Sequence, residues 1–347
     1  MWADQAASPY PAAAELVAAD LAAVEERLAE LIEQQSDYLD DTDLAFYRQG
    51  KRLRPLLLLL SAHAVRRDPV VRLPDKAVIA AVSLELVHVG SLIHDDIVDR
   101  APLRRGLPTL GTSRGYDLAL VLGDLHWAQS ARVAAAGMRT PEDIELLHRF
   151  LAAAEQTCRG QLDEMLKPRG EGTDFVRRYY RTVDRKTGQL ITFACESGAR
   201  LGGGLPAAVG CLRRFGFWLG RAFQVMDDVL DVVRPTPAAG KVAFADLRQG
   251  RLSLPLLYEL EHLPRDHFLW RLAGGGALTD AELDEGVLLL RYGEGWGRAY
   301  ADARAVVAKA CTELSLIEPG VHREALHRLA RHVVDQGFLD SHGVHGC

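Results

Sequence analysis

Apolar residues recur at spacings of three and four along most of the chain, which is the period of helices that bury one face. The segments with this pattern, which we predict to be helices, are 12–35, 56–65, 77–98, 118–136, 143–166, 175–201, 207–233, 252–263, 280–292 and 298–316. Thr140 followed by Pro141, and Thr279 followed by Glu282, are typical of helix N-termini. Alternating β-branched runs between tight turns are missing, so the pattern predicts an all-α fold, a single large helical bundle.

The 347 residues suffice for one or two domains, and 48% of them are hydrophobic, enough for a sizeable core. No stretch with the composition of a linker divides the chain, and no repeat of about 20 to 50 residues occurs. We therefore expect residues 1–347 to form one domain.

The 41 Lys and Arg against 47 Asp and Glu give a net charge of −6, which argues against a nucleic-acid partner. Acidic residues occur early, at 15, 20, 25 and 26, unlike in a signal or transit peptide. The most weakly charged stretch, 77–93, is shorter than the ~20 apolar residues of a membrane span. Five cysteines without a CxxC pair are typical of free thiols in a reducing compartment. We expect a cytoplasmic protein without a membrane span, for which peripheral membrane contact stays open.

Two acidic clusters of the form DDxxD follow apolar helical segments: Asp95, Asp96 and Asp99, then Asp227, Asp228 and Asp231. Carboxylates four residues apart on a helix lie ~5–6 Å apart and repel by roughly 3 kcal/mol at an effective dielectric near 20. A divalent cation offsets this repulsion, and Mg²⁺ is typically shared between one or two carboxylates and substrate phosphates. One DDxxD is often a solvated helix end, but two such clusters favour a metal site.

Basic residues accompany both clusters: Lys51, Arg54, Arg104, Arg105, Lys186 and Lys241. Lysine is rare in this chain, because arginine supplies most of the 41 positive charges. A lysine retained in such a composition indicates a place for a compact point charge, as phosphate often requires.

These residues belong to an ordered set of motifs between about 50 and 255: GKRLRP at 50–55, HVGSLIHDDIVD at 88–99, LRRGLPT at 103–109, GQLDE at 160–164, KTGQL at 186–190 and FQVMDDVLD at 223–231. The set resembles the trans-isoprenyl diphosphate synthases, or polyprenyl synthetases. The resemblance implies a helical bundle around a central active-site cavity, a homodimer, and Mg²⁺-dependent condensation of isopentenyl diphosphate with an allylic diphosphate. The product would be an all-trans polyprenyl diphosphate.

The resemblance also implies roles for single residues. Asp95, Asp99 and Asp227 would bind about three Mg²⁺ ions, flanked by Asp96, Asp228 and Asp231. The allylic diphosphate would contact Arg104, Lys186 and Lys241, and isopentenyl diphosphate would contact Lys51, Arg54, His88 and Arg105. Thr187 and Gln224 would steady the carbocation. Arg251 stands where the family commonly has lysine, a change that alters the shape of the cation but keeps its charge.

Product length should depend on the helix that carries the first cluster. Its residues Ser91, Gly90 and Val87 precede Asp95 by four, five and eight positions. One helical turn is about 5.4 Å, roughly one isoprene unit. Because Gly90 and Ser91 are small, we expect a tunnel open beyond fifteen carbons, a C20 or longer product, and a shorter product from Gly90→Phe.

Three alternatives remain. Glu-x-x-His, the spacing of di-iron bundle proteins, occurs at 85–88, 145–148, 259–262 and 324–327. A class I terpene cyclase would share the fold, but it would carry an Asn/Ser/Glu-type motif in place of the second DDxxD. A non-catalytic partner subunit would typically have lost motif residues that this chain keeps.

Overall fold

The computed structural model describes residues 8–40, 43–44, 47, 50–66, 73–166, 174–233 and 243–335. Its long helices are α2 (Ala18–Glu33), α4 (Leu53–Ala64), α5 (Asp75–Val98), α7 (Tyr116–Ala136), α8 (Pro141–Met165), α10 (Gln189–Leu201), α11 (Pro206–Val233), α15 (Asp280–Tyr292), α16 (Gly295–Leu314) and α17 (Val321–Val334). Shorter elements are α1 (Tyr10–Glu15), α6 (Leu110–Ser113), α9 (Phe175–Val183), the π-helix η1 (Asp184–Gly188), α12 (Ala245–Arg248), α13 (Leu254–Leu260) and α14 (Trp270–Ala273).

The all-α fold predicted from the hydrophobic period is confirmed. Thr140 is the N-cap of α8, as predicted, and it forms a full capping box; the capping box predicted at Thr279 is formed as well. The predicted helix 12–35 is divided, because the backbone at Val17 leaves the helical region. The predicted helix 175–201 contains a wider turn, η1, in its middle. The sequence analysis did not predict α17 or the short helices α6, α12 and α14.

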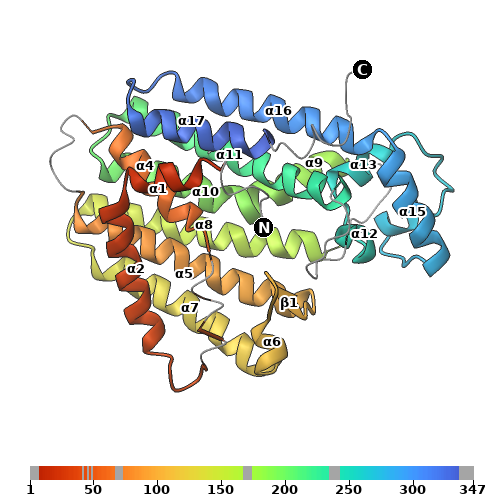
Figure 1. Cartoon of the computed structure of the whole chain (residues 1–347), viewed down its shortest axis with the longest axis horizontal. Coiled ribbons are helices and arrows are strands. Elements are labelled where there is room, and N and C mark those ends of the chain that lie inside the picture. Colours follow the sequence, from red (N-terminus) through yellow and green to blue (C-terminus); the bar gives the residue numbers. More distant parts are fainter. Residues whose placement is uncertain are drawn as a thin grey trace.

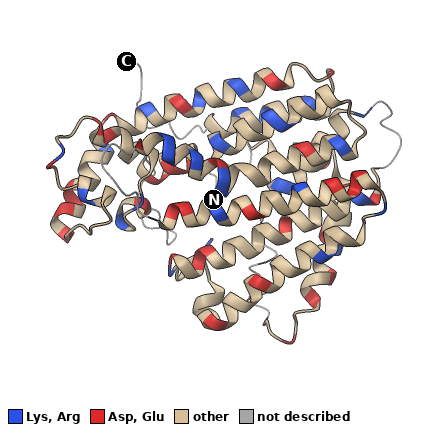
Figure 2. Ribbon diagram, turned by 180° about the vertical axis from the view of Figure 1, so that it is seen from behind, with Lys and Arg blue, Asp and Glu red and all other residues tan. Residues whose placement is uncertain are grey.

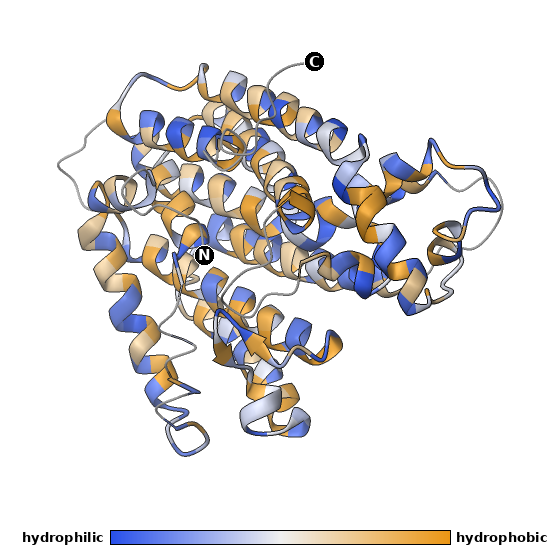
Figure 3. Cartoon of the chain, turned by 45° about the vertical axis from the view of Figure 1, so that its right-hand side comes forward, coloured by the Kyte–Doolittle hydropathy of each residue, from blue (hydrophilic) through white to orange (hydrophobic). Residues whose placement is uncertain are grey.

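The helices are arranged in layers (Figure 1), with α16 and α17 on one side, α10 and α11 in the middle, and α5 and α7 on the other side. α10 runs through the core, since every residue from Leu190 to Ala199 is buried. Most helices carry both hydrophobic and hydrophilic positions (Figure 3), as expected when one face of each lies against the core.

α5 is the one described helix that is long and apolar enough to cross a membrane by length and composition alone. Of that apolar stretch, 61% is buried within the bundle, and a buried core helix meets the same criteria. Lys and Arg alternate with Asp and Glu over the helices seen in Figure 2, so that view has no face of a single charge.

A two-stranded antiparallel hairpin, β1 (Leu103–Arg104) and β2 (Leu107–Pro108), follows α5. It was not predicted, because two-residue strands leave no alternating pattern. Its turn residues Arg105 and Gly106 have φ of 53° and 82°, and two central residues with positive φ are typical of tight hairpins. The hairpin places Arg104 beside Asp96 near the end of α5, and Arg105 near Glu85 in the middle of that helix.

Candidate active site

The first acidic cluster lies at the C-terminal end of α5, where the helix dipole disfavours negative charge. Asp95 and Asp99 remain accessible, with side chains 23% and 21% exposed. Burial raises the pKa of Asp95, and the charges of Glu164 and Asp99 add to this effect against the opposing charge of Lys186. The carboxylates therefore carry negative charge that the protein's own cations only partly offset.

Asp96 of the same cluster faces a different neighbour. It is buried, and it accepts hydrogen bonds from Arg104 Nε at 2.8 and 2.9 Å. This pair fastens the hairpin to α5. In this structure Arg104, which we predicted to contact the allylic diphosphate, is thus held by a carboxylate.

The second cluster, near the end of α11, is divided in the same way. Asp227 is exposed. Asp228 is buried and accepts hydrogen bonds from Tyr179 Oη at 2.6 Å, Gln224 Nε2 at 3.0 Å and the Leu254 amide at 3.3 Å. Burial raises the pKa of Asp228 to about 7.

Asp231 ends the second cluster and shapes the backbone after α11. Its carboxylate accepts hydrogen bonds from the amides of Ala245 and Asp246, both at 3.0 Å. Both amides belong to the first turn of α12, where an anion is favoured. Burial raises the pKa of Asp246 well above its usual range, and the charges of Asp228 and Asp231 add to it. The part of the site formed by α11 and α12, like the end of α5, therefore has an excess of acidic groups.

Two basic side chains, those of Lys186 and Arg251, form ion pairs with carboxylates of the site. Lys186 Nζ, from η1, is 2.6 Å from Glu164 Oε2 and 3.7 Å from Asp95 Oδ1. Arg251 donates a hydrogen bond to Asp99 and lies 3.7 Å from Asp246. Burial alone would lower the pKa of Arg251, but the bond to Asp99 and the charge of Glu164 outweigh it and raise that pKa. Arg251 therefore links the end of α5 to the start of α12.

Thr187 and Gln224 form one hydrogen-bonded chain with the second cluster. Thr187 Oγ1 donates to Gln224 Oε1 at 2.9 Å, and Gln224 Nε2 donates to Asp228 Oδ1 at 3.0 Å. Since Tyr179 donates to the other oxygen of Asp228, the side chains of Asp228 and Gln224 are both fixed in orientation. Tyr179 is a site residue that the sequence analysis missed, because no motif includes it.

The basic residues on α4, α5 and the hairpin form a second region with excess positive charge. Burial lowers the pKa of Arg54 to about 10, although Glu85 opposes the shift. Burial also lowers the pKa of His88 well below its usual range, and the charges of Arg54 and Arg104 lower it further. Burial and the charge of Arg105 lower the pKa of Lys51. Cations that disfavour one another's charge in this way are expected to bind an anion. Lys241, the remaining predicted contact, lies outside the described residues.

Of the residues predicted to limit product length, Val87 and Ser91 are one turn apart on the same side of α5, whereas Gly90 faces α7. Val87 is fully buried, and Ser91 Oγ donates to the His88 carbonyl. Gly90 lies in the seam between α5 and α7, where a Cβ would come within 2.9 Å of Trp127 Cδ1 and 3.1 Å of the Gly123 carbonyl oxygen. A phenylalanine at 90 would therefore press on α7, so Gly90→Phe is no longer a clean test of tunnel length.

Within the described part of the chain, no three His, Cys, Asp or Glu residues converge on one point that could hold a metal ion. The four Glu-x-x-His pairs are spread over α5, α8, α13 and α17. The accessible oxygens of Asp95, Asp99 and Asp227 are the hard ligands that Mg²⁺ prefers, and substrate phosphates would complete its coordination. Together with the raised pKa of Asp95, this donor set fits a divalent cation bound with substrate.

The family model described as polyprenyl synthetase matches residues 37–285. This chain belongs to the polyprenyl synthetase family. It is 32% identical to the nonaprenyl diphosphate synthase of Mycobacterium tuberculosis, covering 92% of this chain and 93% of that one. It is 33% identical to component 2 of the heptaprenyl diphosphate synthase of Geobacillus stearothermophilus, covering 90% and 95%.

Among solved structures, the polyprenyl synthase of Caulobacter crescentus, complexed with calcium and isoprenyl diphosphate, matches with a TM-score of 0.79. The two chains are 26% identical, with 94% of this chain and 97% of that chain covered. The relatives are named for products from geranylgeranyl to nonaprenyl diphosphate. As a polyprenyl synthetase, the protein is a transferase that makes prenyl diphosphates.

Proposed function

We propose that this polyprenyl synthetase condenses isopentenyl diphosphate with an allylic diphosphate in a Mg²⁺-dependent reaction, giving an all-trans product of C20 or longer. The observation that carries the proposal is the pairing of Lys186 with Asp95 and of Arg251 with Asp99 and Asp246. These pairs connect the end of α5, the start of α12 and the middle of η1 in one site. Clusters of basic and acidic side chains whose pKa values are shifted by burial and by one another are typical of sites that bind a charged ligand.

In this proposal Asp95, Asp99 and Asp227 would bind the metal. The flanking aspartates, Asp96, Asp228 and Asp231, instead accept hydrogen bonds from neighbouring protein groups. Bound Mg²⁺ would neutralise the charge that develops on the leaving diphosphate, the largest catalytic contribution available to such a site. Lys186 and Arg251 leave their carboxylates and contact the same diphosphate. Gln224, fixed by Asp228 and Thr187, would present its carbonyl dipole to the cationic carbon.

The second substrate, isopentenyl diphosphate, would bind in the basic region of Lys51, Arg54, His88 and Arg105. Arg54 is partly buried, so a diphosphate there would be partly withdrawn from water, where charge-assisted hydrogen bonds are stronger than at the open surface. The depressed pKa of His88 keeps its ring neutral at pH 7, which leaves one ring nitrogen as an acceptor and the other as a donor.

The experiment is incubation of the purified chain with isopentenyl and farnesyl diphosphates, with and without Mg²⁺. A longer diphosphate that forms only with Mg²⁺ supports the proposal. A cyclic hydrocarbon would indicate a terpene cyclase instead. No product from the purified chain, but product after addition of a second subunit, would indicate a partner subunit, a case raised by the similarity to component 2 of a two-component synthase.

Asp95→Ala tests the assigned metal ligand. We expect turnover to fall by about a hundred-fold or more, because an interaction made with developing charge is lost. The matched control is Asp284→Ala, which removes an exposed carboxylate from α15 and should leave turnover unchanged. Unchanged turnover in Asp95→Ala would contradict the assignment.

A further inference from the structure

A pocket lies beside α9 and η1, and none of the six clustered aspartates lines it. Its volume is about 780 Å³, and its wall comes from α8, α9, η1, α10 and α11. Four arginines line it, at 177, 181, 185 and 221, against two aspartates, at 174 and 184. Nothing in the proposed reaction uses these side chains. The excess of arginine indicates an anionic ligand.

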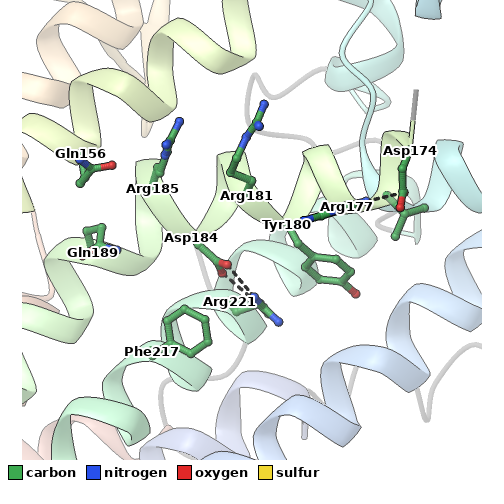
Figure 4. A pocket seen from close by; sticks show the side chains of 11 residues that line it. Gln156, Asp174, Arg177, Tyr180, Arg181, Asp184, Arg185, Gln189, Phe217 and Arg221 are labelled. Atoms are coloured by element: carbon green, nitrogen blue, oxygen red, sulfur yellow. Dashed lines mark hydrogen bonds and ion pairs between the residues drawn. The ribbon is translucent and has the colours of Figure 1, made fainter. Parts of the chain in front are cut away.

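Three of the arginines form one row. Arg177, Arg181 and Arg185 are spaced four residues apart along α9 and η1, so they lie on the same flank. Figure 4 shows the side chains of Arg181 and Arg185 next to each other, pointing the same way. Arg177 is exposed, and within the described residues it has no ion pair. Arg181 is 3.8 Å from Asp163 and 52% exposed. Both guanidinium groups are accessible to a ligand.

Arg221 is held in place from α11. Its guanidinium donates to Asp184 at 2.9 and 2.6 Å (Figure 4). It also lies over the rings of Tyr180 and Phe217, 4.8 Å from each ring centre. Stacking and a two-bond carboxylate contact restrict the guanidinium to one orientation. A guanidinium fixed in this way offers its remaining N–H groups to an oxyanion at little cost in conformational entropy.

The pocket and the proposed active site share η1. Arg185 Nη1 lies 2.7 Å from Asp163 on the outer side, while Lys186 Nζ lies 2.6 Å from Glu164 on the inner side. Asp163 and Glu164 are neighbours in α8, so the two ion pairs brace the same turn from opposite sides. A ligand that draws Arg185 away from Asp163 removes the outer brace. π-turns of this kind occur frequently at functional sites.

We propose that this pocket binds a diphosphate group and that its occupation is transmitted through η1 to Lys186. A diphosphate offers several oxygens to the arginines that line this pocket, and arginine matches such groups with paired hydrogen bonds. The group could belong to free inorganic diphosphate or to the end of an organic ester. The binding stands apart from the proposed function, whereas the coupling rests on it, because Lys186 matters only if the inner site is catalytic.

The binding test is calorimetry on the full-length, metal-free protein, with saturating isopentenyl diphosphate present to fill the other basic region. Inorganic diphosphate and ADP are titrated separately. Binding of inorganic diphosphate alone identifies the free anion, and binding of ADP as well identifies a site that accepts esters. Either result supports the proposal. Absence of binding by both overturns it.

The pocket is identified by Arg177→Gln combined with Arg181→Gln, both exposed positions where the fold should tolerate the change. We expect about tenfold weaker binding or more. The matched control is Arg159→Gln, an exposed arginine of α8 outside the pocket, which should bind as wild type. Wild-type affinity in the double variant, with unfolding temperature unchanged, would place the ligand elsewhere and overturn the proposal.

The coupling is read without enzyme activity, from amide hydrogen exchange in 184–188. We expect exchange there to change when inorganic diphosphate binds the wild-type protein, and to stay constant in the double variant. Binding without any change of exchange in η1 would refute the coupling. Failure of the prenyl transfer assay would leave the binding result standing, so the two proposals fail separately.

Discussion

Asp143 is the residue whose charge most clearly supports a helix. Its carboxylate lies 2.6 Å from Lys76 Nζ of α5 and accepts hydrogen bonds from the amides of Arg139 and Thr140 at 2.9 Å. The bond from Lys76, with those from the backbone, lowers the pKa of Asp143 to about 2. A carboxyl group whose pKa is lower in the folded than in the unfolded state stabilises the fold above its unfolded pKa of about 3.9.

We therefore predict that Asp143→Asn unfolds at a lower temperature than wild type at pH 7. The difference should shrink as pH falls from about 4 to 2, because the wild-type carboxyl becomes protonated over that interval. Thermal unfolding followed by circular dichroism between pH 7 and pH 2 measures it. Asp284→Asn, on exposed α15, is the control. A difference that is constant over the whole range would show that the charge of Asp143 is not the stabilising factor.

Within each DDxxD cluster, the sequence could not predict which aspartates stay accessible and which bind other protein groups. Spacing alone places Asp95 and Asp99, or Asp227 and Asp231, on one face. The structure instead engages Asp231 with the amides of α12, a contact between segments that no local pattern encodes. In the same way, Asp96 could be assigned to the hairpin only once Arg104 was located. The motif predicts the chemistry of the site, while long-range packing decides which oxygens stay accessible.

Among the elements, η1 depends on a close approach of α8. A Cβ built on Gly160 would lie 2.3 Å from the Lys186 backbone nitrogen, so only glycine allows the two segments to meet. We predict that Gly160→Ala displaces η1 and destabilises the protein by about 1–3 kcal/mol. Turnover should fall further than stability alone explains, because Lys186 and Thr187 move with the turn.

Gly297→Ala is the control for this substitution. Gly297 also lies within a helix, α16, but a Cβ there would meet nothing within 4 Å. Its replacement should be neutral or slightly stabilising. Equal unfolding temperatures and equal turnover in both variants would contradict the role of Gly160.

The side chains along α5 are expected to limit product length. Ser91 and Val87 are one turn apart, and Ser91 is partly exposed whereas Val87 is fully buried. We predict that Ser91→Phe gives a shorter product than wild type, because a bulky side chain there would stop the growing chain and each turn is roughly one isoprene unit. Product chromatography measures the lengths, and Ser315→Phe on the surface is the control. Equal products from Ser91→Phe and wild type would rule out this helix as the ruler.

The prediction of helices failed where charged residues interrupt the hydrophobic pattern or where the helix is too short to show one. In α17, charged residues such as Arg328 and Arg331 interrupt the apolar positions, although Leu326, Leu329 and Ala330 are buried. Such a polar helix is fixed by its neighbours more than by its own period. The π-turn in η1 leaves the 3.6-residue pattern almost unchanged, so only the structure reveals it.

At the scale of the whole molecule, α7 and α8 present apolar side chains to solvent. On α7, Leu120 and Val121 are 49% and 63% exposed. On α8, Ile144, Leu151 and Met165 are exposed at multiples of seven residues, the spacing of one helical stripe. Contiguous exposed apolar surface on a folded chain usually marks an interface. The sequence analysis expected a homodimer, with 118–136 too apolar for an exposed face, and the exposure of α7 and α8 supports the same proposal.

We predict that the wild-type protein has twice the 38.1 kDa chain mass in solution at micromolar concentration, and that Val121→Glu combined with Leu151→Glu gives the single-chain mass. A charge buried without a partner at the centre of an interface costs more than most interfaces can offset. Leu288→Glu is the matched control, because Leu288 is 55% exposed but lies on α15, and this variant should remain a dimer. Sedimentation equilibrium measures all three masses. A monomeric wild-type protein would contradict the predicted homodimer. A double variant that remains a dimer would show that the dimer interface lies on another face than that of α7 and α8.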